Sequence, residues 1–284
     1  MSCYLCDSDS FHLRKGAVRD APQLSIHECN HCGLVFLSSI SHIQNGHYEA
    51  SGMFGAEPIA IEKLLRVTEE DDLRRYEMLK SVLTNKKLLD FGCGAAGFLA
   101  KARYSTDSIT GIEIEHRMQQ YWNGKIKIYP DLNSAGGGYN LITAFHVVEH
   151  LNDPRETIRQ LVNKLNPQGR LVIEVPNSDD ALLTLYENSN FQKFTYWSQH
   201  LFLFNFKTLT QLACQAGCSV VSVQQHQRYP LSNHLYWLSH GLPGGHQKFN
   251  FIDSDLLNQA YEKSLAAIGK CDTLIAYLEK KQTN

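Results

Sequence analysis

The 284-residue chain has no apolar run long enough to cross a membrane, and its first residues lack the pattern of a secretory signal peptide. It also lacks a cluster of lysine and arginine, and its formal net charge is −2, so nucleic acid is a disfavoured partner. With 43% hydrophobic and 20% charged residues, the chain can bury a large core. These features predict a cytoplasmic globular protein with no membrane partner.

Eight cysteines in such a chain favour metal binding or free thiols over disulfides. Four of them form two Cys-x-x-Cys pairs separated by 22 residues: Cys3, Cys6, Cys29 and Cys32. Two such pairs can supply four thiolates to a closed structural zinc site, so we expect a zinc ribbon over residues 1–46. His27 and His31 are interpreted as bystanders, because four cysteines fill the coordination shell. A redox role for the cysteine pairs is the alternative.

A short apolar run at residues 87–91 leads into a glycine-rich turn, which opens a helical pattern at 98–103. A strand, a Gly-x-Gly-x-x-Gly turn and a helix in succession predict a nucleotide-binding junction. Gly92 and Gly94 permit unusual backbone angles and close approach of a ligand, and Gly97 allows tight packing of helix on strand.

Two acids indicate S-adenosylmethionine rather than NAD as the ligand. Asp90 precedes the first glycine, where it could hold the amino-acid end of the cofactor directly or through water. Glu113 ends the next apolar run and is expected to accept hydrogen bonds from the ribose hydroxyls. Both cofactor classes use the second acid, so Asp90 carries most of the distinction. A junction without any ligand is the alternative.

The helix-like region at 59–83 precedes this junction, after a connector. Residues 68–71 resemble a helix start with acids in its first turn, and the charges there are interpreted as a solvated face. In the connector, Tyr48 could fold over a bound cofactor or simply pack the linker. After the strand at 125–129, Asp131 could meet the adenine amino group or stabilise a turn.

A cluster of ionisable side chains follows the predicted strand at 139–145. His146, Glu149 and His150 come at its carboxyl end, where open α/β sheets bind ligands, and share one face if the segment is helical. They suit a divalent metal or a proton-transfer site, although hydrogen-bonded pocket walls are the plain alternative. His200 is their expected distant partner.

Periodicity outlines the rest of the chain. We predict a helix at 154–165, a tight turn at 166–169, a strand at 170–175, a cap at 179–194, a helix at 207–217, a strand at 218–224 and amphipathic helix at 253–280. The turn-rich stretch between these last two could be a lid that carries Arg228 and His234 toward a phosphate or carboxylate, or surface loops.

Across residues 85–226 the chain resembles the class I S-adenosylmethionine-dependent methyltransferases. The resemblance lies in LLDFGCGAAGFL, TGIEIE, YNLITAFHVVEHLNDP, LNPQGRLVIEVPN and HLFLFNFKTLTQLACQAGC, in this order. It implies a doubly wound, mostly parallel Rossmann-like α/β sheet. The cysteine-rich front is similar to bacterial methyltransferases with an N-terminal zinc ribbon, several of which act on nucleotide-linked sugars or surface-polysaccharide precursors.

By this resemblance Asp90, Gly92 and Gly94 line the methionine end, Glu113 binds the ribose, and Asp131 with Leu132 flanks adenine. The remaining residues assigned to the cofactor are Cys93, Gly97 and Phe145. The VVEHL segment with a downstream histidine is also similar to ubiquinone-pathway O-methyltransferases and small-RNA 2′-O-methyltransferases, some of which use a divalent ion. Those enzymes have glutamate where this chain has His146.

We therefore expect a zinc ribbon (1–46), a connector and helix (47–84), a methyltransferase domain (85–230) and a lid-like loop with a helical C-terminal extension (231–284). The expected reaction is methyl transfer to a nucleotide-linked sugar, with His150 or His146 as base, Glu149 orienting it and His200 helping to bind the acceptor. O-methylation of a phenolic metabolite and a catalytically silent binding module are the alternatives. The C-terminal helices could also mediate a homodimer.

Overall fold

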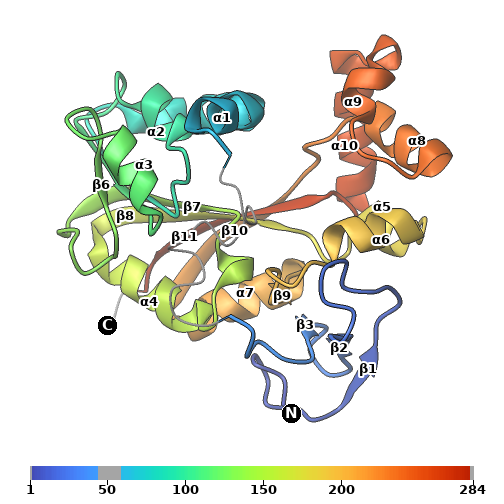
Figure 1. Ribbon diagram of the computed structural model, residues 1–284. Helices are drawn as coiled ribbons and strands as arrows, with labels where there is room; N and C mark the ends of the chain where they lie inside the picture. The colour runs from blue at the N-terminus through green and yellow to red at the C-terminus, as the bar shows by residue number, and fades with distance from the viewer. Residues whose placement is uncertain (1, 44–58, 282–284) are drawn as a thin grey trace.

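The computed structural model describes residues 2–43 and 59–281, so Tyr48 lies outside the described residues. Its centre is a seven-stranded sheet in the order β10-β11-β8-β7-β4-β5-β6 (Figure 1). The strands are β4 (Lys87–Phe91), β5 (Ser108–Ile112), β6 (Lys127–Tyr129), β7 (Tyr139–Phe145), β8 (Leu165–Pro176), β10 (Cys218–His226) and β11 (Thr273–Lys280). Strands β4 to β8 run parallel, and β11 is antiparallel to both neighbours.

Helices cover both faces of this sheet, which confirms the predicted doubly wound α/β class (Figure 1). One face carries α1 (Ile61–Leu83), α2 (Gly97–Ala102) and α3 (His116–Tyr121), and the other carries α4 (Pro154–Lys164) and α7 (Phe206–Gln215). Asp153 caps α4 by accepting from the Glu156 amide, with Pro154 in the first turn. No helix among the described residues is both long and apolar enough to span a bilayer.

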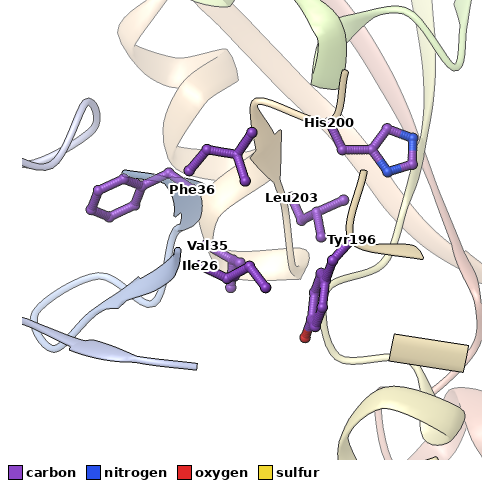
Figure 2. A pocket seen from close by; sticks show the side chains of 7 residues that line it. Ile26, Val35, Phe36, Tyr196, His200 and Leu203 are labelled. Carbon is purple, nitrogen blue, oxygen red and sulfur yellow. The ribbon is translucent and has the colours of Figure 1, made fainter. Parts of the chain in front are cut away.

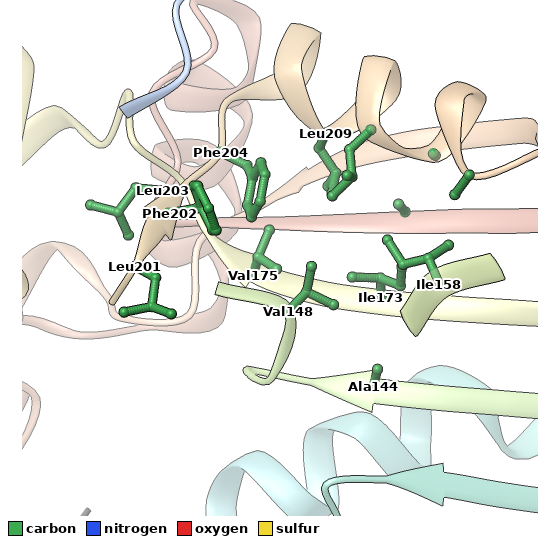
Figure 3. Close-up of a cluster of buried hydrophobic side chains, with 14 of the residues drawn as sticks. Ala144, Val148, Ile158, Ile173, Val175, Leu201, Phe202, Leu203, Phe204 and Leu209 are labelled. Atoms are coloured by element: carbon green, nitrogen blue, oxygen red, sulfur yellow. The ribbon is translucent and has the colours of Figure 1, made fainter. Parts of the chain in front are cut away.

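The N-terminal module forms a four-stranded antiparallel sheet in the order β1-β2-β3-β9. Three of its strands are β1 (Phe11–Leu13), β2 (Ile26–Cys29) and β3 (Val35–Leu37). The fourth, β9 (Phe202–Leu203), comes from a distant part of the sequence. Phe204, directly after β9, packs in the same core as Val175 of the large sheet (Figure 3). The module therefore shares its sheet and its core with the rest of the protein.

The prediction of helix over 253–280 is wrong in its second half. Helix α10 (Asp255–Ala267) ends before Gly269, whose φ is +73°, and β11 follows between β8 and β10. A short continuous apolar run reads equally as a buried strand or a buried helix segment, and here burial on both faces decides for a strand.

Three smaller expectations also change. Helix α1 begins at Ile61 and passes straight through residues 68–71, so no helix starts there. The expected turn at 166–169 lies within the bounds of β8, at a register shift where the pairing moves from Tyr139 with Leu165 to Leu141 with Arg170. There the Gln168 amide donates to Asn166 Oδ1 at 3.0 Å. The turn-rich region contains α8 (Leu231–His240) and the short α9 (Gly245–Lys248).

The remaining short elements are α5 (Ala181–Thr184), α6 (Ser189–Thr195) and two 3₁₀ turns, η1 (Val148–His150) and η2 (Asn250–Ile252). Helices α8, α9 and α10 stand together at one end of the sheet (Figure 1). Turn η1 follows β7 directly and begins the candidate site.

Candidate active site

Asp90 lies at the carboxyl end of β4 and is 4% exposed. The Thr143 hydroxyl on the neighbouring β7 donates to its Oδ1 at 2.6 Å. Burial raises the pKa of Asp90 to about 7. A cationic ligand at this position would favour the ionised carboxylate.

The glycine-rich turn folds over the end of β5. Gly92 and Cys93 donate their amides to the Ile112 carbonyl at 2.9 and 3.0 Å, and the Gly94 amide donates to Glu113 Oε2 at 2.8 Å. Gly92 and Gly94 have φ values of +68° and +52°, which side chains rarely adopt. The turn and Glu113 are thus built as one unit.

Asp90 lies near the end of β4, and Glu113 directly follows the adjacent parallel strand β5, at the same edge of the sheet. The second oxygen of Glu113 accepts from the Glu115 amide at 3.1 Å. Burial raises the pKa of Glu113. A buried carboxyl group, that of Asp90, and a partly exposed one, that of Glu113, therefore flank the glycine turn, as the sequence predicts.

Gly97 allows close packing, but its neighbour is helix α1 rather than a strand. A Cβ at Gly97 would lie 2.0 Å from Asp72 Oδ2. Asp72 is buried and accepts from Thr68 Oγ1 at 2.7 Å, and burial raises its pKa. The interpretation of the α1 charges as a solvated face is therefore wrong for Asp72, whereas Glu69 and Glu70 are exposed as expected.

The two residues assigned near adenine, Asp131 and Leu132, and Phe145, assigned to the cofactor, differ in environment. Asp131 is exposed and accepts from the Ser134 amide and hydroxyl at 2.9 and 3.0 Å, which is the turn alternative. Leu132 is buried. Phe145 is buried with its ring 5.2 Å from that of Phe98. Contact of Asp131 and Leu132 with adenine, and of Phe145 with the cofactor, stays a prediction.

Three of the four predicted catalytic residues converge beyond β7. Glu149, His150 and His200 each offer a possible ligand atom, and these atoms lie within 4.8 Å of one another. Glu149 is fully buried, and its Oε2 has no hydrogen-bond partner within the described residues. A buried carboxylate oxygen in this state is unusual and suits a cation or a donated proton.

The two imidazoles of this cluster are fixed by backbone carbonyls. His150 Nδ1 donates to the Gln199 carbonyl and His200 Nδ1 to the Thr195 carbonyl, each at 2.8 Å. Because carbonyls only accept, both neutral rings carry the proton on Nδ1 and the lone pair on Nε2. Burial, followed by the neighbouring His150, lowers the pKa of His200 to about 4.

His146 lies beside this cluster between two carboxylates. Its Nδ1 is 3.2 Å from Glu149 Oε1, and its Nε2 is 3.1 Å from Glu174 Oε1 and 3.0 Å from an Arg228 nitrogen. Burial and the charge of Arg228 act to lower the pKa of His146, but the two carboxylates outweigh them and raise it. Its φ of +54° marks backbone strain at the site.

Residues 66–223, more than half of the chain, match the family model described as "Methyltransferase domain". The chain belongs to this methyltransferase family. The predictions of an S-adenosylmethionine-dependent methyltransferase and of its class I fold are thereby confirmed.

Known proteins resemble this methyltransferase over parts of its length. A mitochondrial ubiquinone biosynthesis O-methyltransferase of Schizosaccharomyces pombe is 27% identical over 125 residues, which are 39% of this chain and 45% of that enzyme, so the match spans less than half of the curated relative. A SAM-dependent methyltransferase of Archaeoglobus fulgidus shares the fold with a TM-score of 0.51 at 20% identity, covering 76% of this chain and 94% of that one. The complex of the Haloferax volcanii Trm112 methyltransferase activator with a putative methyltransferase is similar with a TM-score of 0.54 at 12% identity. That match covers 83% of this chain and 97% of that one.

The methyltransferase site also contains a buried ion network that sequence reasoning missed. Glu174 on β8 is fully buried, and Arg74 and Arg75 of α1 both donate to it, at distances from 2.7 to 3.2 Å. Burial acts to raise the pKa of Glu174, but His146 and the arginines hold it well below its usual range. An acid inside an otherwise apolar strand was the available signal.

The two predicted lid residues, Arg228 and His234, lie in different parts of the structure. Arg228 reaches the site, where it pairs with Asp71 of α1 and contacts His146. His234 is instead buried against Tyr261, with 2.7 Å between His234 Nδ1 and the tyrosine hydroxyl. Of the two, only Arg228 lies beside the catalytic cluster.

The four ribbon cysteines form one group, with sulfur–sulfur distances of 3.5 Å for Cys3 with Cys32 and for Cys6 with Cys29. Zn–S bonds of about 2.3 Å in a tetrahedron place sulfurs roughly 3.8 Å apart, so the group fits a zinc ion. A disulfide would require about 2.05 Å. His27 stacks on Phe11 outside the group.

Proposed function

We propose that this protein transfers the methyl group of S-adenosylmethionine to a small-molecule acceptor, most favourably a nucleotide-linked sugar or a surface-polysaccharide precursor. The observation that carries the proposal is a juxtaposition at one edge of the sheet. The Asp90–Glu113 pair follows β4 and β5, and the cluster of Glu149, His150 and His200 lies just beyond the adjacent β7.

In the proposed complex Asp90 attracts the cofactor ammonium and Glu113 accepts from the ribose hydroxyls. The acceptor heteroatom loses its proton to the protein as it attacks the methyl carbon. The carbon–sulfur bond breaks as the new bond to the acceptor forms, its electron pair stays on sulfur, and the products are the methylated acceptor and S-adenosylhomocysteine. Positioning and proton removal are the protein's main contributions.

His150 is the better base of the two candidates. Both ring nitrogens of His146 already lie 3.2 and 3.1 Å from carboxylates, whereas His150 is oriented through Nδ1 by the Gln199 carbonyl and carries its lone pair on Nε2. Glu149 Oε1 lies 3.8 Å from this Nε2 and stabilises the imidazolium that forms when His150 takes the proton, and His200 contacts the acceptor. The same set of Glu149, His150 and His200 would also suit a divalent cation, which would polarise an acceptor oxygen when bound.

An anionic acceptor is supported by the arginines beside the cluster. Arg74, Arg75 and Arg228 come from elements around the acceptor side, where they pair with Glu174 and Asp71, and Nη1 of Arg74 is buried without a partner among the described residues. A phosphate oxygen of the acceptor would satisfy this donor. The match to a ubiquinone biosynthesis O-methyltransferase favours a phenolic acceptor as the second candidate.

Two further parts of the proposal concern the ribbon and assembly. We infer that the cysteine group holds structural zinc. Elemental analysis should find about one zinc per chain, and chelation should remove this zinc and lower the melting temperature.

A homodimer through α8–α10 is supported by the exposed side chains of Phe251, Leu256 and Ile268, and light scattering tests it. A cytoplasmic location stays a prediction.

The deciding experiment combines calorimetry with S-adenosylhomocysteine and a transfer assay with CD3-labelled S-adenosylmethionine. Label appearing in UDP- or dTDP-hexoses supports the proposal, and label appearing in catechols supports the second candidate. Absence of cofactor binding would overturn both and would indicate a silent binding module.

A further inference from the structure

A segment of the chain at residues 194–204 lies between the cysteine ribbon and the catalytic cluster. It follows the end of α6, carries His200 and ends just after β9. Some of its backbone N–H and C=O groups form hydrogen bonds with the ribbon, and others form hydrogen bonds with the catalytic cluster. The proposed methyl transfer does not itself require the bonds to the ribbon.

On the ribbon side, the segment completes the small sheet. Strand β9 pairs with β3, so that Leu203 opposes Val35 and Phe202 opposes Phe36. The Leu37 amide then donates to the Leu201 carbonyl at 3.2 Å, one residue after His200. The end of β3 is therefore in register with the residue that follows the catalytic histidine.

Two ribbon loops hold the part of the segment before His200. The Asp20 carboxylate accepts from the Ser198 amide at 2.9 Å and from its hydroxyl at 2.7 Å. His42 Nε2 donates to the Ser198 carbonyl at 2.7 Å. The Arg19 amide donates to the Tyr196 carbonyl at 2.9 Å.

On the site side, the same segment bonds to the catalytic turn η1. The Leu201 amide donates to the Glu149 carbonyl at 2.9 Å, and the Gln199 carbonyl accepts from His150 Nδ1 at 2.8 Å. Residues 198–201 thus touch the ribbon and the catalytic cluster within four consecutive positions.

Packing along this seam leaves little room for independent movement. Figure 2 shows Ile26, Val35 and Phe36 of the ribbon on one side and Tyr196, His200 and Leu203 on the other. The space that they enclose is about 10 Å³, roughly one water-sized sphere. A close-packed interface transmits displacements instead of absorbing them.

We propose that the ribbon positions His200, and that Asp20 is a positioning residue that acts through Ser198. The inference rests on the proposed role of His200 in acceptor binding. Strand β4, which carries Asp90, and strand β5, which Glu113 follows, make none of these contacts. A disturbed ribbon loop should therefore impair the acceptor half of the site while cofactor binding persists.

The test compares Asp20→Ala with Asp20→Asn in the full-length protein. Asparagine can still accept from the Ser198 amide and can donate to its hydroxyl, so it should rescue the wild-type behaviour. Asp9→Ala is the matched control, since Asp9 is an exposed aspartate of the same module. Ser198→Ala removes only one of the two bonds and serves if Asp20→Ala does not fold.

The first readout is the Nδ1–H signal of His200 in spectra of ¹⁵N-histidine-labelled protein, assigned by its absence in His200→Gln. We expect Asp20→Ala to lose or broaden this signal, because the hydrogen bond to Thr195 depends on the held segment. Methyl transfer should fall about 10- to 100-fold, while affinity for S-adenosylhomocysteine stays within about twofold.

An unchanged His200 signal and transfer rate in Asp20→Ala would overturn the inference. Equal losses in Asp9→Ala, or no rescue by Asp20→Asn, would also overturn it, by indicating general damage to the ribbon. Full transfer activity in His200→Gln would instead overturn the proposed role of His200, whatever the Asp20 variants show.

Discussion

The two halves of the site are built on different scales. The proposed cofactor half comes from one stretch between Asp90 and Glu113, and its polar contacts are with the backbone amides of Gly94 and Glu115 and with Thr143. The proposed acceptor half joins helix α1, turn η1, strand β8, the segment around His200 and the residue Arg228. A local unit tolerates changes elsewhere, whereas an assembled unit depends on every element that contributes to it.

The largest effect is expected from Glu149→Gln, which removes the central carboxylate of the acceptor half. Methyl transfer should fall about 10²- to 10⁴-fold, because proton removal or cation binding loses its anionic partner. Affinity for S-adenosylhomocysteine should not change in calorimetry. Glu77→Gln on the surface of α1 is the control, and equal activity of the two variants would contradict the assigned role.

Glu174→Gln should break the buried network that ties α1 to β8. Two arginines and His146 lose their shared carboxylate, so the free energy of unfolding should drop by about 3–5 kcal/mol. Urea denaturation measures this change. Glu279→Gln breaks the partly exposed pair with Arg170 and should cost about 1 kcal/mol or less. Similar losses in both variants would show that burial of Glu174 has no special weight.

Asp90→Asn tests the cofactor half alone. We expect affinity for S-adenosylhomocysteine to fall by about 1.5–3 kcal/mol, because a hydrogen bond to a charged group is lost. The fold should persist, since the replacement has the same shape and removes a buried carboxyl. Calorimetry measures this affinity, with Asp107→Asn at an exposed position as the control variant. Wild-type affinity in Asp90→Asn would show that Asp90 is not part of the cofactor site.

The smallest effect expected is a pH dependence. The pKa of Asp90 is about 7 in the folded protein, so the carboxyl becomes protonated as pH falls through 7 and ceases to attract the cofactor ammonium. Affinity should weaken by about fivefold between pH 7 and pH 6, because the ionised fraction of a carboxyl group with this pKa falls from about one half to about one eleventh. Stability changes in the opposite sense, because a raised carboxyl pKa costs stability as pH rises from the ordinary carboxyl range toward 7. Asp90→Asn should lack the Asp90 part of both trends.

The difference in scale also explains what the sequence could predict. Strand β4, the glycine turn and the acids at its ends follow from a local pattern and were placed correctly. Glu174 was visible as an acid in an apolar strand, but its partners Arg74 and Arg75 lie about one hundred positions earlier. Periodicity describes neighbours along the chain and contains no information on such pairs.

The same reasoning applies to β11 and β9. The residues of β11 were predicted as helix because an apolar run of that length fits both periods, and only its place between β8 and β10 decides. Strand β9 has two residues, too few for any pattern, and gains its structure from β3. The sequence therefore contains no pattern that places His200 beside Glu149 and His150, and its role as their distant partner could only be guessed.

The place of β11 has a consequence for how the chain is made. Synthesis delivers β8 and β10 first, yet the two are separated in the sheet by a strand that leaves the ribosome later than both. Until residue 280 emerges, both strands present unpaired edges, which invite association between nascent chains. Ribosome stalling between α8 and β11 would thus yield an aggregation-prone product, even though every residue of the proposed catalytic cluster had already been translated.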